Sequence, residues 1–286
     1  MFKKFINGLV FGAGFAIAFI AVVIIYFQFF FESMYENNLV SSKEVVDSPP
    51  SIKAQKKYLG SNAVFSGKFV KNRNVLASGS GEIIGKAMLN GNPVSGLKLR
   101  LALNGSIMSQ WSITNSEGVY SVSMPYAEYK IDGFELDSNS ANALLAGKID
   151  HPQNAHSTGN FEVSKEKKGQ GLVFRFVDPI KKNITKNKYS VSDDVTLKWA
   201  AYSGASAYDI QLYEKTDPHA YIGDKALFEW SSRPRVSDTS FNLKEHGVEL
   251  KVGNFYELEI YARDNSMRVI SQTYRIHSGY DFEVTN

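Results

Sequence analysis

Two histidines lie close enough in the sequence to raise the question of a metal site. Four residues separate His151 from His156. Zinc takes three or four protein ligands, which are oriented by further hydrogen-bonding groups. No third ligand at a matching spacing accompanies the pair, and the chain has no cysteine. We therefore expect a polar loop here, with no metal and no cofactor.

Two glutamates raise the question of acid–base catalysis. Glu257 and Glu259 are two residues apart, which on a strand places both carboxylates on one face. Proton transfer by paired carboxylates requires a cleft that tunes their pKa values. Apolar residues alternate with this pair, as on an antiparallel strand with one solvated face. The pattern predicts exposed glutamates rather than catalytic ones.

Other catalytic patterns are absent from the sequence. It contains no Gly-x-Ser-x-Gly elbow, no phosphate-binding glycine loop with Lys-Ser or Lys-Thr, and no His-Glu-x-x-His. We expect no catalytic residue and no enzymatic activity.

A basic cluster and one tryptophan are candidates for binding. Lys181, Lys182, Lys186 and Lys188 could contact an acidic polymer, but they lack the interleaved aromatic residues of a single-strand binder. We therefore interpret them as solvated lysines of a connection. Trp230 precedes two arginines, and Trp and Arg are enriched at binding hot spots. The alternative for Trp230 is packing over the edge of a β-sandwich, and the sequence identifies no ligand-binding residue.

The N-terminal segment predicts a membrane anchor. Residues 5–31 are almost entirely apolar and contain no charge, and a helix that crosses the hydrocarbon core needs roughly 20 such residues. A cleavable signal peptide would have a shorter apolar region, followed by a small-x-small site. This run instead ends in three phenylalanines, 29–31, which favours an uncleaved transmembrane signal anchor.

The flanking charges predict the orientation of the anchor. Lys3 and Lys4 precede the run and Glu32 follows it, so residues 1–4 are expected in the cytoplasm. The bulk of the chain would then be periplasmic or extracellular, held at the inner (plasma) membrane. The net charge is +3, and without the two lysines it is 3 − 2 = +1. Such a near-neutral remainder gives no reason to expect nucleic acid as a partner.

The rest of the chain predicts a mainly β protein. Residues 32–61 contain Pro49-Pro50 and few apolar residues, as in a flexible tether. Beyond them, short alternating segments are separated by turn residues every ten positions or so, which favours β-sandwiches. The expected fold is one transmembrane helix followed by two antiparallel β-sandwich domains, 62–180 and 189–286, joined by a linker at 181–188.

The first domain contains strands expected at 81–89 and 97–103, with turns at 90–93 and 115–118. Residues 91–96 (Gly-Asn-Pro-Val-Ser-Gly) and 114–120 (Thr-Asn-Ser-Glu-Gly-Val-Tyr) resemble a carboxypeptidase regulatory-like domain, which is a transthyretin-type sandwich. The resemblance covers 81–131 and fades over 132–159. It implies an accessory domain without catalytic residues.

The second domain resembles a fibronectin type III domain. Trp199 occupies the position of that family's early tryptophan, and Leu250 precedes Tyr256 by six residues, which is the spacing of its tyrosine corner. Val252 stands in place of the usual proline, and the connection 214–242 is longer than the family pattern. The resemblance implies a second sandwich.

The leading functional hypothesis is a non-catalytic envelope interaction or scaffold protein that presents both domains to a protein partner. The alternative is a protein that binds carbohydrate, either peptidoglycan or exopolysaccharide, because many sandwiches bind sugars through exposed aromatic rings.

Overall fold

The computed structural model describes residues 57–65, 74–220, 225–274 and 279–286. The predicted anchor at 5–31, with the four residues before it and most of the 32–61 tether, lies outside these ranges. Among the described residues, no helix is both long and apolar enough to cross a membrane. Residues 52–286 form one compact unit, whose described part is mainly β. It contains two separate hydrophobic cores, which define a first β region (58–177) and a second β region (180–285).

Thirteen strands and one described helix make up the first β region. They are β1 (Ala63–Phe65), β2 (Asn74–Val75), β3 (Gly81–Leu89), β4 (Asn92–Pro93), β5 (Lys98–Leu103), β6 (Ile107–Met108), β7 (Ser112–Ile113), β8 (Val119–Met124), β9 (Ala127–Tyr129), β10 (Ile131–Leu136), α2 (Ser138–Leu144), β11 (Ile149–Asp150), β12 (Phe161–Val163) and β13 (Gly169–Val177).

Nine further strands are described in the second β region. They are β14 (Lys188–Ser190), β15 (Thr196–Lys198), β16 (Ala207–Lys215), β17 (Lys225–Ala226), β18 (Arg235–Val236), β19 (Ser240–Asn242), β20 (Phe255–Arg263), β21 (Val269–Gln272) and β22 (Phe282–Thr285).

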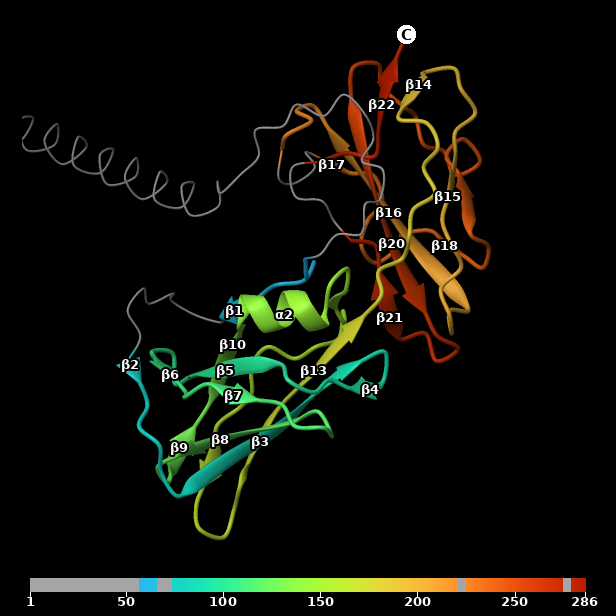
Figure 1. Ribbon diagram of the computed structural model, residues 1–286. Coiled ribbons are helices and arrows are strands. Elements are labelled where there is room, and N and C mark those ends of the chain that lie inside the picture. The colour runs from blue at the N-terminus through green and yellow to red at the C-terminus, as the bar shows by residue number, and fades with distance from the viewer. Residues whose placement is uncertain (1–56, 66–73, 221–224, 275–278) are drawn as a thin grey trace, which may run out of the picture. The chain divides into compact units, whose positions relative to one another are not determined.

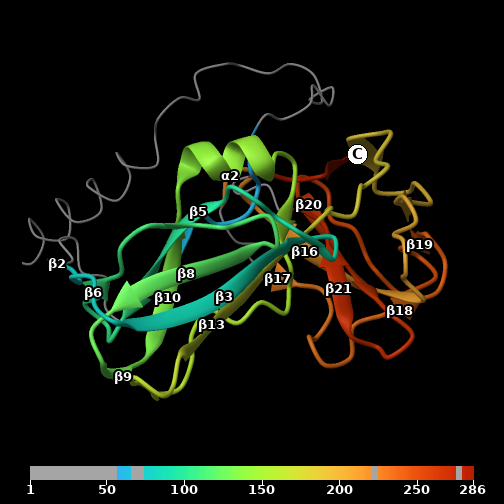
Figure 2. The ribbon, with the colours of Figure 1, turned by 60° about the horizontal axis from the view of Figure 1, so that its bottom comes forward.

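The sheets of the first β region enclose a shared apolar core. One sheet has the order β1-β10-β5-β6-β2, and the other has the order β11-β13-β3-β4 with β8 also paired to β3. Figure 2 shows β3 between β8 and β13. The leucines of 97–103 are fully buried, and so are Tyr120 and Met124 of β8. The strands predicted from these alternating patterns are therefore confirmed.

The first hairpin follows directly from its sequence. β3 and β4 pair at Leu89 and Asn92, which leaves only Asn90 and Gly91 in the turn. Both residues have positive φ, 49° and 82°, which is the requirement of a type I′ turn and the reason for the Asn-Gly preference. The turn predicted at 90–93 is therefore present.

The largest sheet of the second β region is built around β16 and β20. Its order is β14-β22-β20-β16-β17, with β18 beside β16 and β21 beside β20, as Figure 1 shows. β16 and β20 pair without interruption from Ala207↔Arg263 to Lys215↔Phe255. Trp199 and the apolar residues of β16 and β20 share the core with Phe241 of β19. The alternating apolar residues of 208–212 and 256–262 predict β16 and β20, and both strands are confirmed.

A tyrosine corner closes this core. The hydroxyl oxygen of Tyr256 accepts a hydrogen bond from the backbone N–H of Lys251 at 2.9 Å. The Leu250–Tyr256 spacing predicted this contact, and Val252 does not prevent it although it replaces the usual proline. Burial raises the pKa of Tyr256 to about 12, so its phenol stays neutral.

The first described residues pack into the fold, although the sequence assigns them to the tether. Tyr58 belongs to the segment expected to be tether, yet its side chain is 2% exposed and packs edge-on against Phe176. Tyr58 forms a β-bridge with Ala146, and its hydroxyl donates a hydrogen bond to Asp150. One apolar ring in a polar segment is too weak a pattern to predict such docking.

Candidate functional site

A bulge beside β16 presents Trp230. β17 and β18 both pair with β16, at Tyr213↔Ala226 and Tyr208↔Val236. The two pairs are five residues apart along β16, but they are ten residues apart along the segment from β17 to β18. The five extra residues therefore project from the sheet edge, and bulges of this kind re-aim side chains. The long connection noted in the sequence is the source of this bulge.

The bulge is fixed at both ends. The backbone N–H of Leu227 donates to the carbonyl of Leu212 at 2.9 Å, and that of Ile210 donates to the carbonyl of Pro234 at 2.9 Å. Between them, the side-chain amide of Gln211 donates to the carbonyl of Phe228 at 3.0 Å. The segment carrying Trp230 is therefore held at three points on one strand.

The Trp230 ring is exposed but supported from below. Its side chain is 60% exposed, and its ring centroid lies 3.9 Å from the Arg233 guanidinium carbon. Arg233 also lies 4.5 Å from the ring of Tyr261, and the two aromatic rings meet edge-on at 5.5 Å. Cation–π contacts of this kind fix the indole without covering it.

Asp209 anchors this arrangement beneath the sheet surface. Its carboxylate is 1% exposed and forms salt bridges with Arg233 at 3.0 Å, Arg235 at 2.6 Å and Arg263 at 2.6 Å. Burial by itself would raise the pKa of Asp209, but the hydrogen bonds from Arg235 and Arg263 and the charge of Arg233 hold it below its ordinary value. Asp209 is therefore an ionised structural anion. The name Trp230 platform is used below for Trp230, Arg233, Arg235, Tyr261, Arg263 and Asp209.

Tyr261 contributes a neutral phenol to the platform. Burial, followed by the neighbouring carboxylate of Glu259, raises the pKa of Tyr261 well above its ordinary value. The phenol donates a hydrogen bond to Glu259 Oε2 at 2.7 Å. At physiological pH the Tyr261 ring therefore packs beside Arg233 in its neutral form and does not donate a proton to solvent.

The predicted exposure of Glu257 and Glu259 is wrong. Their side chains are 3% and 8% exposed in the described structure. The polar face of β16 and β20 is covered. Glu257 forms a salt bridge of 2.8 Å with Lys215, whose side chain is 0% exposed. Alternation correctly placed both carboxylates opposite the apolar core, but it does not reveal what covers the second face.

The histidine pair has a structural setting. The backbone N–H of Gln153 donates to His151 Nδ1 at 3.1 Å, and the His156 ring stacks on Phe134 with centroids 5.9 Å apart. Burial, and then Arg175, lowers the pKa of His151. Within the described ranges, no group of three or more His, Asp or Glu residues could hold a metal ion.

Three lysines of the basic cluster are paired. Lys182 contacts Asp281 at 2.6 Å with only 16% of its side chain exposed, and Lys186 contacts Asp193 at 2.7 Å. Lys188 begins β14 and contacts Glu283 at 2.6 Å. The interpretation of the whole cluster as solvated lysines is therefore wrong for Lys182, because its partner Asp281 lies 99 residues away and the local sequence gives no sign of it.

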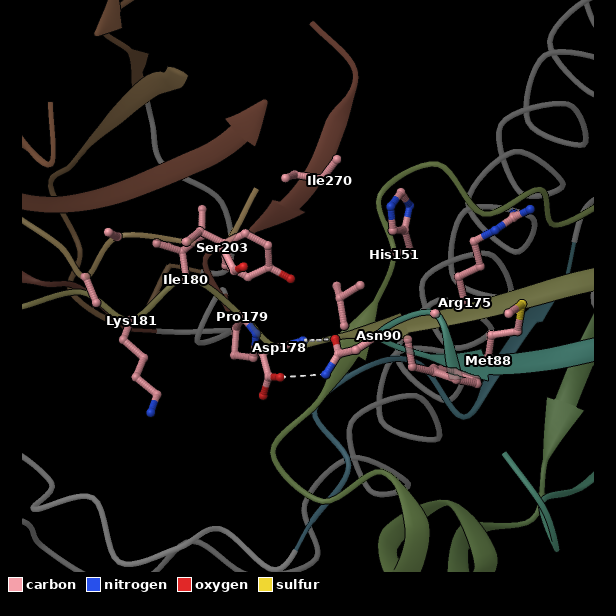
Figure 3. Close-up of a pocket in the computed structure, with 16 residues that line it drawn as sticks. Met88, Asn90, His151, Arg175, Asp178, Pro179, Ile180, Lys181, Ser203 and Ile270 are labelled. Atoms are coloured by element: carbon pink, nitrogen blue, oxygen red, sulfur yellow. Dashed lines mark hydrogen bonds between the residues drawn. The ribbon is translucent and has the colours of Figure 1, made fainter. Parts of the chain in front are cut away.

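A separate cavity of about 940 Å³ lies in the same compact unit. Figure 3 shows two of its lining residues, Asn90 and Asp178, hydrogen-bonded to each other, and the amide nitrogen of Asn90 lies 2.8 Å from Asp178 Oδ2. Two cationic side chains line it, Arg175 and Lys181, and in Figure 3 they point away from one another. Because these charges do not converge, we place the candidate site at the Trp230 platform.

Sequence reasoning found Trp230 and its two following arginines but missed Asp209 and Arg263. Asp209 belongs to no recognisable motif, and Arg263 lies 54 residues away from it. The antiparallel register of β16 and β20 brings them together. The available signal was that Asp209 and Arg263 each lie on the strand face opposite the apolar one. This signal indicates a covered face only after the pairing of β16 with β20 is known.

Comparison with protein-family models finds no match, and comparison with curated proteins finds none either. Among solved structures, a DUF3823 family protein from Parabacteroides merdae is 10% identical, with a TM-score of 0.23, covering 68% of this chain and 96% of its own. The Bacillus anthracis TIE protein is 13% identical, with a TM-score of 0.26 and coverages of 72% and 32%. The FN1–FN3 domains of chicken CNTN1 are 12% identical, with a TM-score of 0.21 and coverages of 68% and 61%. Likenesses this weak support no inference about function.

Proposed function

We propose that the chain is a single-pass membrane protein that presents two β-sandwich domains outside the cytoplasm and binds a protein partner of the cell envelope. The uncharged apolar run at 5–31 and the lysines before it support the anchor and its orientation. The two separate hydrophobic cores support the division into domains at 62–180 and 189–286.

The exposed ring of Trp230 is the observation that carries the binding role. A tryptophan that is 60% exposed and yet held by Arg233 and Tyr261 loses little conformational freedom when a partner covers it. Pre-ordered Trp and Arg side chains are the groups that dominate binding energy at protein interfaces. The Trp230 platform is therefore the proposed contact surface.

The platform suits binding better than catalysis. Asp209 is already ionised and surrounded by guanidinium groups, so it is a poor general base. The arginines stay protonated at any physiological pH. None of these groups is poised to exchange a proton near neutral pH, which supports a non-catalytic role.

In-cell photocrosslinking tests the proposal. A photoreactive amino acid replaces Trp230 in the full-length chain, and crosslinked products are identified by mass spectrometry. The matched control is the same replacement at Trp111, which is 37% exposed and also stacks on an arginine, Arg100, at 4.6 Å. We expect a protein product at position 230 and none at position 111. The same replacement at the exposed neighbour Ser231 leaves Trp230 in place. A lack of any protein product at both position 230 and position 231 would refute the partner role.

Membrane insertion is tested separately by fractionation and by protease protection in spheroplasts, in which the periplasmic side of the membrane is open to added protease. We expect the chain in the membrane fraction, with the second β region cleaved by protease added from outside. Recovery of a soluble polypeptide shortened near Phe31 would contradict the anchor.

Carbohydrate binding is the second candidate, because the same exposed indole could stack on a sugar. A pull-down with purified cell wall and with exopolysaccharide, comparing the unaltered chain with Trp230→Ala, tests it. The cation beneath the ring favours the protein partner, because it draws on the electron-rich indole face that stacking on sugar C–H groups requires.

A further inference from the structure

The Trp230 platform carries more positive charge than its own carboxylate neutralises. Arg233, Arg235 and Arg263 all pair with the single carboxylate of Asp209. The three guanidinium groups lie near two carboxylates, that of Asp209 and that of Glu259, which accepts a hydrogen bond from Tyr261. This leaves one surplus positive charge in the cluster. One guanidinium nitrogen, Nη1 of Arg233, is buried without a hydrogen-bond partner among the described residues. Such a surplus attracts anions and repels cations.

A second exposed tryptophan, Trp111, lies beside two cationic side chains, Lys98 and Arg100. Trp111 lies over Arg100, with 4.6 Å between the ring centroid and the guanidinium carbon. Arg100 pairs one to one with Glu135 through both Nε at 2.8 Å and Nη2 at 2.6 Å. Arg100 is therefore engaged through two of its nitrogens, and Lys98 Nζ lies 5.1 Å from the Trp111 ring centroid. The Trp230 platform differs in having an exposed arginine whose Nη atoms are available, not in net charge alone.

Arg235 is the group of the platform that a ligand can reach. Its side chain is 46% exposed, and its Nε donates to Asp209 Oδ1 at 2.6 Å. No described residue accepts a hydrogen bond from its two Nη atoms, whereas Nη1 of Arg263 donates to the carbonyl of Met267. Two free, parallel N–H groups match the oxygens of a carboxylate in a bidentate pair.

We propose that the Trp230 platform docks an acidic segment of the protein partner. A carboxylate of that segment binds the Nη atoms of Arg235, while an apolar side chain next to it covers the exposed face of Trp230. This inference rests on the proposed function, since it specifies the chemistry of the partner's contact segment. Charge complementarity sets the sign of that segment, and the supported indole supplies its apolar contact.

Glu229 provides an internal check on the sign of the partner. It is exposed and immediately precedes Trp230, so its charge opposes an acidic segment. Glu229→Gln should therefore strengthen binding of an acidic segment and weaken binding of a basic one.

The experiment measures binding of defined probes to the purified full-length chain in detergent. The main probe is a fluorescein-labelled peptide with four glutamates and two leucines. The same peptide with lysines in place of the glutamates is the charge control, and polygalacturonate represents an acidic polysaccharide. Fluorescence anisotropy gives the Kd at low and high NaCl, and circular dichroism confirms that each variant is folded.

The variants separate the two contacts of the proposal. Trp230→Ala and Arg235→Gln should each raise the Kd of the acidic peptide at least ~10-fold, as for hot-spot residues. Arg235→Lys should recover part of the loss, because it restores the charge but not the bidentate geometry. The matched controls Trp111→Ala and Arg268→Gln should change the Kd less than about twofold, as surrounding residues usually do. Added NaCl should weaken binding.

Several outcomes would overturn the proposal. They are equal affinity for the lysine peptide, an unchanged Kd in Arg235→Gln, no binding of the acidic peptide up to about 1 mM, and binding of polygalacturonate alone. If position 230 still crosslinks to a protein in cells, any of these results rules out an acidic contact segment but leaves the proposed binding of a protein partner intact. Absence of the crosslink removes the proposed function itself.

Discussion

β3 of the first β region and β16 of the second have the same length, nine residues each, but they bury their side chains differently. Along β3 the fully buried positions alternate with more exposed ones, as on a sheet with one apolar face. Along β16 seven residues are buried, on both faces. One of its faces meets the apolar core, while the other holds Asp209, Gln211 and Lys215.

This difference concerns how each region is stabilised. The interior of the first region is apolar, so it depends on packing and on glycines where the backbone approaches closely. The second region adds a layer of buried charges, which must be paired to be tolerated. The platform at Trp230 is an extension of that layer, because Asp209 belongs to both.

The largest effect is expected from breaking the buried pair of the second region. Lys215 is fully buried and donates from Nζ to the carbonyl of Gly279 at 2.6 Å and to Glu257 at 2.8 Å. Lys215→Ala should lower the free energy of unfolding by about 3–5 kcal/mol, because Glu257 loses its lysine in a dry interior. Hydrogen exchange of β16 and β20, followed by mass spectrometry, measures the loss.

Two further variants make this result specific. Lys215→Met combined with Glu257→Met should be more stable than Lys215→Ala, since it removes both charges and fills the space. Lys188→Ala removes an exposed ion pair with Glu283 and should leave exchange in β16 nearly unchanged. Equal exchange in Lys215→Ala and Lys188→Ala would show that the buried layer is not structural.

The second largest effect is expected from a backbone substitution that destabilises the first β region. Gly118 has a φ of +70°, and a Cβ there would lie 2.5 Å from the carbonyl oxygen of Ala87. Gly118→Ala should cost about 2–4 kcal/mol, from the left-handed conformation and the overlap together. Urea unfolding monitored by exchange in β3 and β8 measures it, and exchange in β16 should not change.

The third effect concerns pH and the platform. The pKa of Asp209 is held below its ordinary value in the folded chain, so its stabilisation is fully present above the unfolded pKa of about 3.9. That stabilisation is lost as pH falls through the folded pKa. Asp209→Asn should therefore cost about 1.5–3 kcal/mol at pH 7, and the gap should narrow in acid, as pH falls below about 3.9. A gap that is the same at pH 7 and in acid, measured by urea unfolding, would exclude this linkage.

The smallest effect is the counterpart of Gly118 in the second region. Gly253 has a φ of +83°, but nothing lies within 4 Å of the position that a Cβ would take. Gly253→Ala should cost only about 1 kcal/mol, which is the penalty of the left-handed conformation alone. A cost as large as that of Gly118→Ala, in the same urea assay, would mean that backbone overlap at Gly118 contributes little.

Local patterns predicted much of the strand structure. The leucine alternation of 97–103, the Asn90-Gly91 turn and the Leu250–Tyr256 spacing each depend on residues that are close in sequence, so their physics is contained in the pattern. The helix α2 was not predicted, because its seven residues are too few to show a sustained helical period. Strand β22 was not predicted.

The candidate site was only half visible in the sequence. Trp230 and Arg233 are neighbours along the chain, but Asp209 reaches them through the register of the sheet. The predicted exposure of Glu257 and Glu259 was wrong for the same reason, because the exposure of a side chain depends on which segments cover that face of the strand. Contacts between distant segments decide both, and no local pattern records them.

Tyr58 has a consequence for a chain that is pulled from its N-terminal side. Tension that arrives before residue 58 first meets the Tyr58–Ala146 bridge and then β1. If a partner bound the Trp230 platform at the same time, the whole first β region would lie between the two points at which force is applied. Extending its roughly 120 residues would add about 400 Å of reach. The first β region would then act as a force-dependent spacer, and single-molecule stretching of the chain would show its extension as a discrete step.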